Sequence, residues 1–425
     1  MQKMHQKESR QLSTIFFVLL MGSFVAIAPV STDIYLPALP AMETDLHAAA
    51  GSGALTLSAW VLGVAIGQLL AGPLMDRFGR RMPLLVGTLI YALASIGCAL
   101  SPSMPFLYFF RLIAAFFAAF SLVAPQACIR DVAKGNDGAR LLSRLALVQG
   151  IVPLLAPAIG GMILEYMSWR VLFWAMAFYG FFSATLVYWV PKNTSKNHLD
   201  FETKKENIFI SFFRMYCNVC RDRFFRYYGM IWVLQGIFIF SYLSAAPSIF
   251  EKSFGLTPTQ YGILFGATAF MMILMTQVNA VLLKKFRTEF LLRASGFIGL
   301  FLACVFLITS FLSSDTLLHG AMADRQIWFL PVAGTLLFLL CAFVMLGPNA
   351  CACALYSQGK TAGTAASLAG SGLYLIGFLS SLLMGFAPQG TSVPLAIIFL
   401  FAMGLQLAFA LKAPSLPQEE HKEAL

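Results

Sequence analysis

The chain has 425 residues, of which 59% are hydrophobic and only 11% are charged. Soluble domains average about 25% charged residues, so a chain this poor in charge cannot cover a water-facing surface and needs lipid as its solvent. Its formal net charge of +10 is scattered over several short segments, which argues against a nucleic-acid surface.

Apolar runs long enough for a helix to cross the bilayer, about twenty residues each, recur along the whole chain. Transmembrane strands would give alternating runs of about ten residues, so an all-α membrane protein is expected. The first run is too long for a cleavable signal peptide and lacks a small-residue cleavage site. Twelve spans are predicted at residues 12–36 (which could extend to 42), 52–71, 82–101, 104–126, 143–164, 168–190, 224–246, 259–280, 290–312, 326–346, 363–387 and 391–412.

The only long polar stretch separates six spans from six spans. We therefore expect an N-terminal six-helix bundle over 1–190, a cytoplasmic linker over 191–223, and a C-terminal six-helix bundle with a short cytoplasmic tail over 224–425. With both termini in the cytoplasm, only Arg170, Lys252 and Arg325 of the 29 basic residues fall in external loops, as the positive-inside rule requires. This layout is typical of repeat-built transporters, whose substrate site lies between the halves.

An acidic residue stands near the end of the first span, in "VSTDIYLPALPAM" at residues 30–42. Asp33 lies well inside the membrane if that helix runs to about 42, whereas it can reach the interface if the helix stops at 36. An ionisable residue inside a span is a functional hypothesis by default. Arg111 of the fourth span falls at a similar depth, and the C-terminal half offers no charge inside its spans. We expect Asp33 to accept the transported proton, with nearby Arg111 favouring its ionised form and burial opposing it.

The loop after the second span reads "GPLMDRFGRR" at residues 72–81. Gly72 is expected to end a helix and permit close helix approach, and Gly79 to make a tight turn. Asp76 can face helix N-termini, and Arg77, Arg80 and Arg81 anchor the loop in the cytoplasm. The alternative is an ordinary solvated basic turn.

This segment resembles the signature loop of the major facilitator superfamily nearly residue for residue. The fifth span, "GIVPLLAPAIGG" at 150–161, is similar to the antiporter motif of that superfamily through Gly150, Pro157, Gly160 and Gly161. Small residues there would let helices pack closely, and Pro157 would bend the span. A generic packing helix is the alternative. The fourth span, "LYFFRLIAAFFAA" at 107–119, resembles the buried-arginine motif, although Ala114 and Ala115 replace its usual Gln-Gly pair.

Three further segments, "STDIYLPALPAM", "CIRDVAKG" and "GPNACACALYSQGKTAGTAASLAG", together resemble the Bcr/CflA group of drug-resistance transporters. The resemblance implies two pseudo-symmetric six-helix bundles, working as a monomer in the bacterial cytoplasmic (inner) membrane. It implies efflux of small amphiphilic compounds, such as chloramphenicol-type antibiotics, driven by inward proton flow without a cofactor. It also implies that Asp131 pairs with Arg77 or Arg80 as a latch of the outward-open state. An ordinary surface ion pair is the alternative.

Polar and aromatic side chains from several spans are candidates for the substrate cavity, since broad specificity needs apolar walls with few polar groups. Interfacial aromatic belts and interhelical hydrogen bonds are the alternatives for them. The candidates are Tyr35, Gln126, Gln149, Gln235, Tyr242, Asn349 and Tyr374. No metal site is expected, because Cys217 and Cys220 have no second pair at zinc spacing.

Three other functions stay open at this stage. An exporter of an endogenous metabolite, such as a siderophore, sugar or amino-acid derivative, would share every feature above. A passive facilitator would share the fold but would not need Asp33. A membrane enzyme would need a constellation of nucleophiles, bases or metal ligands that the sequence does not offer.

Overall fold

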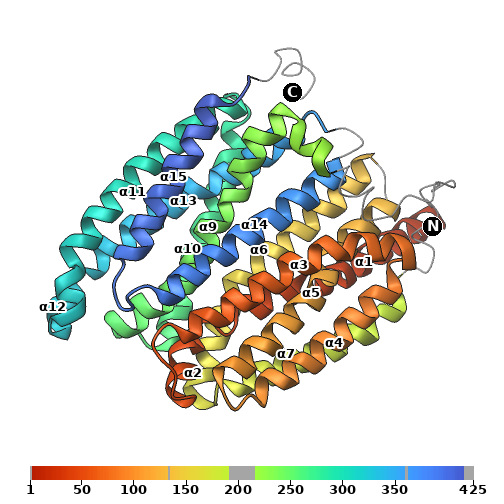
Figure 1. The fold of residues 1–425 in the computed structure, drawn as a ribbon. Helices are drawn as coiled ribbons and strands as arrows, with labels where there is room; N and C mark the ends of the chain where they lie inside the picture. The colour runs from red at the N-terminus through yellow and green to blue at the C-terminus, as the bar shows by residue number, and fades with distance from the viewer. Residues whose placement is uncertain (1, 133–134, 191–215, 359–361, 416–425) are drawn as a thin grey trace.

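The computed structural model describes residues 2–132, 135–190, 216–358 and 362–415, and all regular elements in these ranges are helical (Figure 1). The first half contains α1 (Gln2–Asp33), η1 (Leu36–Ala38), α2 (Leu39–Asp45), α3 (Ser52–Phe78), α4 (Arg81–Ala99), α5 (Met104–Val132), α6 (Gly135–Tyr166), α7 (Arg170–Leu186) and η2 (Val187–Trp189). The second half contains η3 (Phe225–Gly229), α9 (Met230–Pro247), η4 (Ser248–Ser253), α10 (Pro258–Leu282), α11 (Thr288–His319), α12 (Met322–Ile327), α13 (Phe329–Leu355), α14 (Ala362–Phe386) and α15 (Val393–Lys412).

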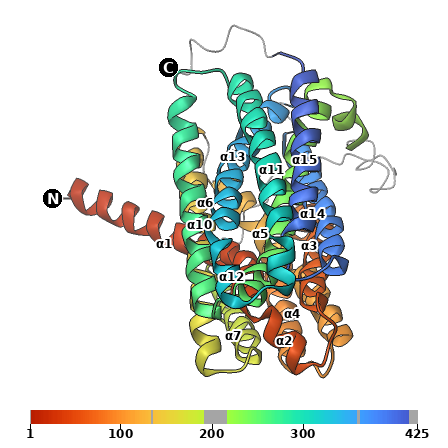
Figure 2. The same cartoon turned by 90° about the vertical axis from the view of Figure 1, so that its left-hand side faces the viewer.

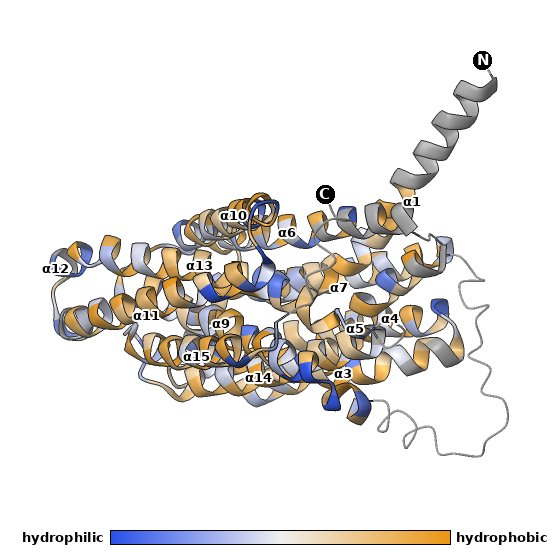
Figure 3. Ribbon diagram, turned by 90° about the horizontal axis from the view of Figure 1, so that it is seen from above, coloured by the Kyte–Doolittle hydropathy of each residue, from blue (hydrophilic) through white to orange (hydrophobic). Residues whose placement is uncertain are grey.

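The described residues contain 12 helical segments long and apolar enough to cross a membrane, which confirms the predicted number of spans. Most bounds agree with the prediction to within a few residues. The first, seventh and tenth spans, Phe16–Asp45, Phe225–Ser253 and Asp324–Leu355, extend farther than predicted. Large apolar side chains such as Phe178, Phe301 and Leu330 are exposed. Orange, the colour of hydrophobic residues, predominates along the helices in Figure 3. Such an apolar exterior suits lipid and not water.

The spans alternate in direction, so the molecule has two distinct ends. We call the end where α3 finishes and α6 begins the linker end, and the opposite end, where α2 and α12 lie, the α2 end (Figure 1). Helices α1 and α3–α7 pack on one another, as do α9–α11 and α13–α15. The two groups meet where α6 lies beside α10 and α3 lies beside α14 (Figures 2 and 3). The predicted domain boundaries remain a prediction, since residues 191–215 lie outside the described ranges.

The first span is not the single helix that the sequence analysis expected. Its long helix ends at Asp33, and the chain continues through the turn η1 into the short helix α2. Pro37 accounts for the break, because a helical proline would clash with the carbonyl four residues earlier, and that carbonyl belongs to Asp33. The backbone of this span is therefore interrupted inside the apolar segment Phe16–Asp45.

Candidate functional site

Asp33 lies at the C-terminal end of α1, within the break of the first span. Its side chain is buried, with 5% of the residue exposed. The apolar segment Phe16–Asp45 continues beyond Asp33, which favours a position inside the membrane over one at the interface. The interrupted helix thus presents one carboxyl group to the interior of the bundle.

Arg111 of α5 is also buried, but the structure does not pair it with Asp33. Its Nη2 donates a hydrogen bond to the carbonyl oxygen of Ser31 at 3.1 Å. Its guanidinium carbon lies 4.2 Å from the ring centroid of Tyr35 and 4.5 Å from that of Trp60. Among the described residues no ion pair joins Arg111 to Asp33, so the expected influence of the Arg111 charge on the carboxyl group of Asp33 stays a prediction.

The position of Arg111 suits a different task. The last carbonyls of a helix lack partners within the helix, and a cation near them is favourable. Arg111 satisfies the carbonyl of Ser31, two residues before the end of α1. Stacking of a desolvated guanidinium on aromatic rings contributes about 2 kcal/mol. Arg111 therefore stabilises the helix break that carries Asp33.

Two of the residues near Asp33 come from the other half of the molecule. The charge of Asp33 acts on the phenol groups of Tyr261 in α10 and Tyr374 in α14. Tyr374 was a predicted cavity residue, whereas Tyr261 was not. Nothing in the sequence distinguishes Tyr261 from the other tyrosines, since only the packing of α10 against the break in the first span gives it this position.

Helices α6 and α10 approach each other closely at glycines in the half of each helix nearer the α2 end. A Cβ atom on Gly161 would overlap the carbonyl oxygen of Pro258, and one on Gly266 would lie 2.8 Å from the carbonyl oxygen of Leu154. A Cβ atom on Gly150, nearer the linker end, would meet nothing closer than 3.7 Å. A Cβ atom on Gly160 would likewise overlap a backbone atom, the carbonyl oxygen of Ile34. The expected close packing is therefore confirmed for Gly160 and Gly161 but not for Gly150.

Helices α3 and α14 join the two halves in the same way. At the α2 end, a Cβ atom on Gly51 would overlap the carbonyl oxygen of Gly385. Deeper in the bundle, Ser58 Oγ donates to Ser381 Oγ at 2.9 Å, and Ser381 in turn contacts Ser244 Oγ at 2.6 Å. These contacts bury polar groups from both halves against each other.

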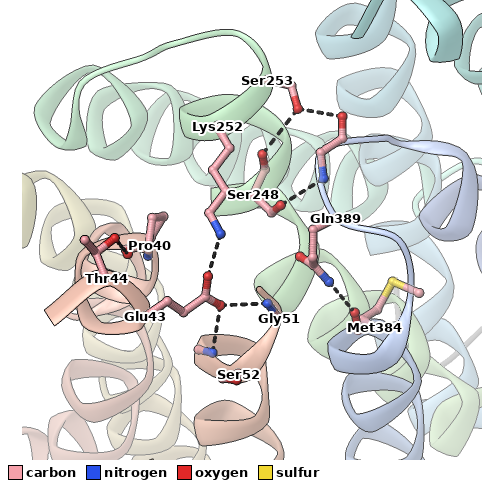
Figure 4. A network of polar contacts seen from close by, with 12 residues as sticks. Pro40, Glu43, Thr44, Gly51, Ser52, Ser248, Lys252, Ser253, Met384 and Gln389 are labelled. Atoms are coloured by element: carbon pink, nitrogen blue, oxygen red, sulfur yellow. Dashed lines mark hydrogen bonds and ion pairs between the residues drawn. The ribbon is translucent and has the colours of Figure 1, made fainter. Parts of the chain in front are cut away.

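An ion pair closes the α2 end between the halves (Figure 4). Glu43 of α2 accepts hydrogen bonds from the backbone N–H groups of Gly51 and Gly53, at 2.9 and 2.8 Å. Its other oxygen accepts from Lys252 Nζ of η4, in the opposite half. The sequence analysis placed Lys252 in an external loop and gave Glu43 no role. Neither residue belongs to a recognisable motif, and 209 positions separate them.

The loop at 72–81 is only partly described. Gly79 has a φ of 77°, which favours glycine, so the predicted tight turn is confirmed. Gly72 does not end a helix, because α3 continues to Phe78, and a Cβ atom on Gly72 would meet none of the described atoms within 4 Å. Arg80 precedes α4, and the guanidinium of Arg81 lies 5.3 Å from the ring centroid of Tyr188. The predicted latch stays a prediction, since the side chains of Asp76, Arg77 and Asp131 lie outside those described.

The remaining cavity candidates do not form one group. Tyr35 is buried under Arg111, and Asn349 exchanges two hydrogen bonds with Asn279, at 3.0 and 3.1 Å. Tyr242 stacks on Phe265 with ring centroids 5.6 Å apart. Gln235 is buried and its Nε2 has no partner among the described residues. Gln126 is exposed, Gln149 is half-buried, and the ring of Tyr374 packs on Phe240.

Pro157, which was expected to bend the fifth span, lies inside the continuous helix α6.

Comparison with known proteins gives one family and several relatives. A family model described as the Major Facilitator Superfamily matches residues 19–381. The chain is 29% identical to an uncharacterized MFS-type transporter, YdgK, of Bacillus subtilis, over 92% of this chain and 93% of that protein. It is 28% identical to a bicyclomycin resistance protein homolog of Haemophilus influenzae, over 93% and 94% of the two chains.

Two further comparisons extend this result. A chloramphenicol resistance protein of Pseudomonas aeruginosa is 27% identical, over 89% of this chain and 86% of that one. Among solved structures, the crystal structure of a D-xylose–proton symporter superposes with a TM-score of 0.70 over 96% of this chain and 99% of that chain. Its sequence identity is 16%, so this likeness concerns the fold alone.

Proposed function

Because the chain belongs to the major facilitator superfamily, we propose that it exports small amphiphilic compounds across the bacterial cytoplasmic membrane in exchange for protons. The family makes the chain a transporter and not an enzyme. The names of the bicyclomycin- and chloramphenicol-resistance relatives support drug-like molecules as cargo. We assign the linker end to the cytoplasm, because the basic loops of the sequence gather there.

The observation that carries the proposal is the buried carboxyl group of Asp33 at the break in the first span. An ionised carboxylate enclosed away from water is costly unless it is paired or neutralised. No ion pair involving Asp33 occurs among the described residues, so a proton or a bound substrate is left to neutralise it. Proton and substrate then compete for one site, which is what exchange of one for the other requires.

The packing between the halves supports alternating access to that site. The structure is closed at the α2 end, where backbone contacts and the Glu43–Lys252 ion pair join the halves. The close backbone contacts between α6 and α10 at glycines lie in the half of each helix nearer the α2 end. In this state the compound enters from the cytoplasm while Asp33 is ionised. Rocking of the halves then exposes Asp33 to the outside, where a proton neutralises it and the compound leaves.

The test is substitution of Asp33→Asn in the full chain, reconstituted in liposomes with radiolabelled chloramphenicol as the probe. Asp45→Asn is the matched control, because it changes the same side chain at the exposed end of the same span. Transport driven by a pH gradient should be lost in Asp33→Asn and kept in Asp45→Asn. Full gradient-driven transport by Asp33→Asn, or undiminished transport by the wild type after the gradient is collapsed, would refute the proposal.

A further inference from the structure

The seventh span ends in a π-helical turn, η4, that carries a second carboxyl group. The span runs to Ser253 and therefore contains Glu251, so the expectation that the C-terminal half has no charge inside its spans is wrong. Glu251 is half-buried, and its Oε1 is fully enclosed without a hydrogen-bond partner among the described residues. An enclosed carboxylate oxygen without a partner calls for an explanation, such as a bound proton or water.

The cations around η4 are engaged elsewhere. The ammonium group of Lys252, the next residue, donates to Glu43 across the interface (Figure 4). Arg325, on α12, donates to the carbonyl oxygens of Gly320 and Ser253, at 2.8 and 3.3 Å. The charge of Lys252 acts on the adjacent Glu251, but neither cation forms an ion pair with it among the described residues. In the part of the chain that the structure describes, an ion pair therefore does not account for the enclosed carboxyl group of Glu251.

Tyr261 connects this carboxyl group to Asp33. It is fully buried on α10, and its hydroxyl group has no described partner. The charges of Glu251 and Asp33 both act on its phenol, as does the hydroxyl group of Tyr242 on α9. Tyr261 is thus near a carboxyl group of each half.

Backbone contacts support this placement independently of charge. The first turn of α10 packs on Gly161, through Pro258 and Thr259. The adjacent Gly160 packs on the carbonyl of Ile34, the residue that follows Asp33. Helix α10 also contacts both η1 and η4. The start of α10 therefore touches the break in the first span on one side and the turn with Glu251 on the other.

A third enclosed polar atom without a described partner, Thr259 Oγ1, lies on the same first turn of α10. A hydroxyl group can donate and accept at once, and buried waters typically satisfy polar groups that otherwise lack partners. The Oε1 of Glu251, the Oγ1 of Thr259 and the Oη of Tyr261 are suited to such waters. A carboxyl group and two hydroxyl groups of this kind can pass a proton.

We propose that Glu251 and Tyr261 form a second proton-binding site, in the C-terminal half, that delivers protons from the α2 end to Asp33. Glu251 takes one proton from external water and becomes a neutral acid. The oxygen of Tyr261 accepts that proton while its own proton passes to the carboxylate of Asp33, and Glu251 returns to its ionised form. One proton moves inward with no other change. This inference rests on the proposed function, since it assigns the proton route of that exchange.

The test begins with a measurement that needs no substrate. Infrared difference spectra of the purified full chain between acidic and alkaline buffer record the carbonyl band of protonated carboxyl groups. Glu251→Gln should remove one component of that band and Asp33→Asn another. Glu165→Gln is the matched control, because it removes an exposed carboxyl group at the α2 end of α6. A Glu251→Gln spectrum identical to the wild type would overturn the proposal.

The second measurement follows transport of radiolabelled chloramphenicol in liposomes. Glu251→Gln and the isosteric variant Tyr261→Phe should slow gradient-driven transport about tenfold or more. They should leave exchange of labelled for unlabelled compound at equal pH unchanged, which also shows that both variants fold. Equal slowing of both processes, or no slowing, would overturn the relay. Gradient-driven transport that survives in Asp33→Asn would refute the proposed function instead, while the infrared band of Glu251 would still decide the second site.

Discussion

The ion pair at the α2 end makes a quantitative prediction about the balance between the two open states. Lys252→Met removes the ammonium group that links η4 to Glu43, and leaves Glu43 bonded to Gly51 and Gly53 within its own half. The substitution therefore weakens the contact between the halves without disturbing the fold of either. We expect it to favour the state that is open at the α2 end.

The size of the effect follows from the exposure of the pair. The side chains of Lys252 and Glu43 are 34% and 9% exposed. Hydrogen bonds to charged groups contribute about 1.5–3 kcal/mol, whereas exposed ion pairs contribute about 0–1 kcal/mol. A pair with one partly exposed and one nearly buried member falls between them, at about 1.5 kcal/mol. That free energy corresponds to about a tenfold shift in the equilibrium between the closed and open states.

Double electron–electron resonance measures this shift directly. Spin labels at Met167 and Ile327, both exposed and in different halves at the α2 end, report the distance across the closure. In Lys252→Met the ratio of long to short distances should rise about tenfold. Asp45→Asn is the matched control, because it breaks an ion pair of 3.1 Å with Arg170 inside one half. An unchanged distribution in Lys252→Met, or an equal change in Asp45→Asn, would refute the reasoning.

Two further predictions concern single contacts. Arg111→Lys keeps the charge but loses the planar group that stacks on Tyr35 and Trp60, so the free energy of unfolding should fall by about 2 kcal/mol, measured as a lower midpoint of thermal unfolding in detergent. Arg170→Lys is the control, because the cation of Arg170 is partly exposed beside Trp169, and it should change that midpoint little. Equal changes in the two variants would contradict this account. Gly160→Ala would drive a methyl group into the carbonyl of Ile34 and should lower transport and cost about 1–3 kcal/mol of stability. Gly150→Ala, with its nearest neighbour at 3.7 Å, should do neither, and a Gly160→Ala variant as stable and active as the wild type would show that the backbone contact is unimportant.

Local signals in the sequence were sufficient for several features. Gly79 needed only its place between two apolar runs to predict a turn, because the positive φ is a local property. The break at Asp33 was also within reach of sequence reasoning, since Pro37 stands four residues later. Treating the first span as one helix missed that signal and misplaced Asp33 relative to its helix end.

Other features needed the packed structure. The depths of Asp33 and Arg111 could be compared from residue counts, yet depth gives no information on the direction in which a side chain points. In the packed structure Arg111 contacts Ser31 and aromatic rings, and Asp33 lies near Tyr261 of the other half. The sequence analysis also missed Glu251 as a charge inside a span. Its predicted seventh span ended at residue 246, whereas the span in the structure runs to Ser253.

The sequence by itself determined that lipid surrounds the protein, how many spans it has and which family it resembles. Each of these depends on runs of apolar residues or on short motifs that are local in the chain. Only the tertiary structure decided which charges meet, which end is closed and what surrounds Asp33. The Glu43–Lys252 pair shows the reason: its members are 209 positions apart, and their contact exists only once two separately packed groups of helices have docked.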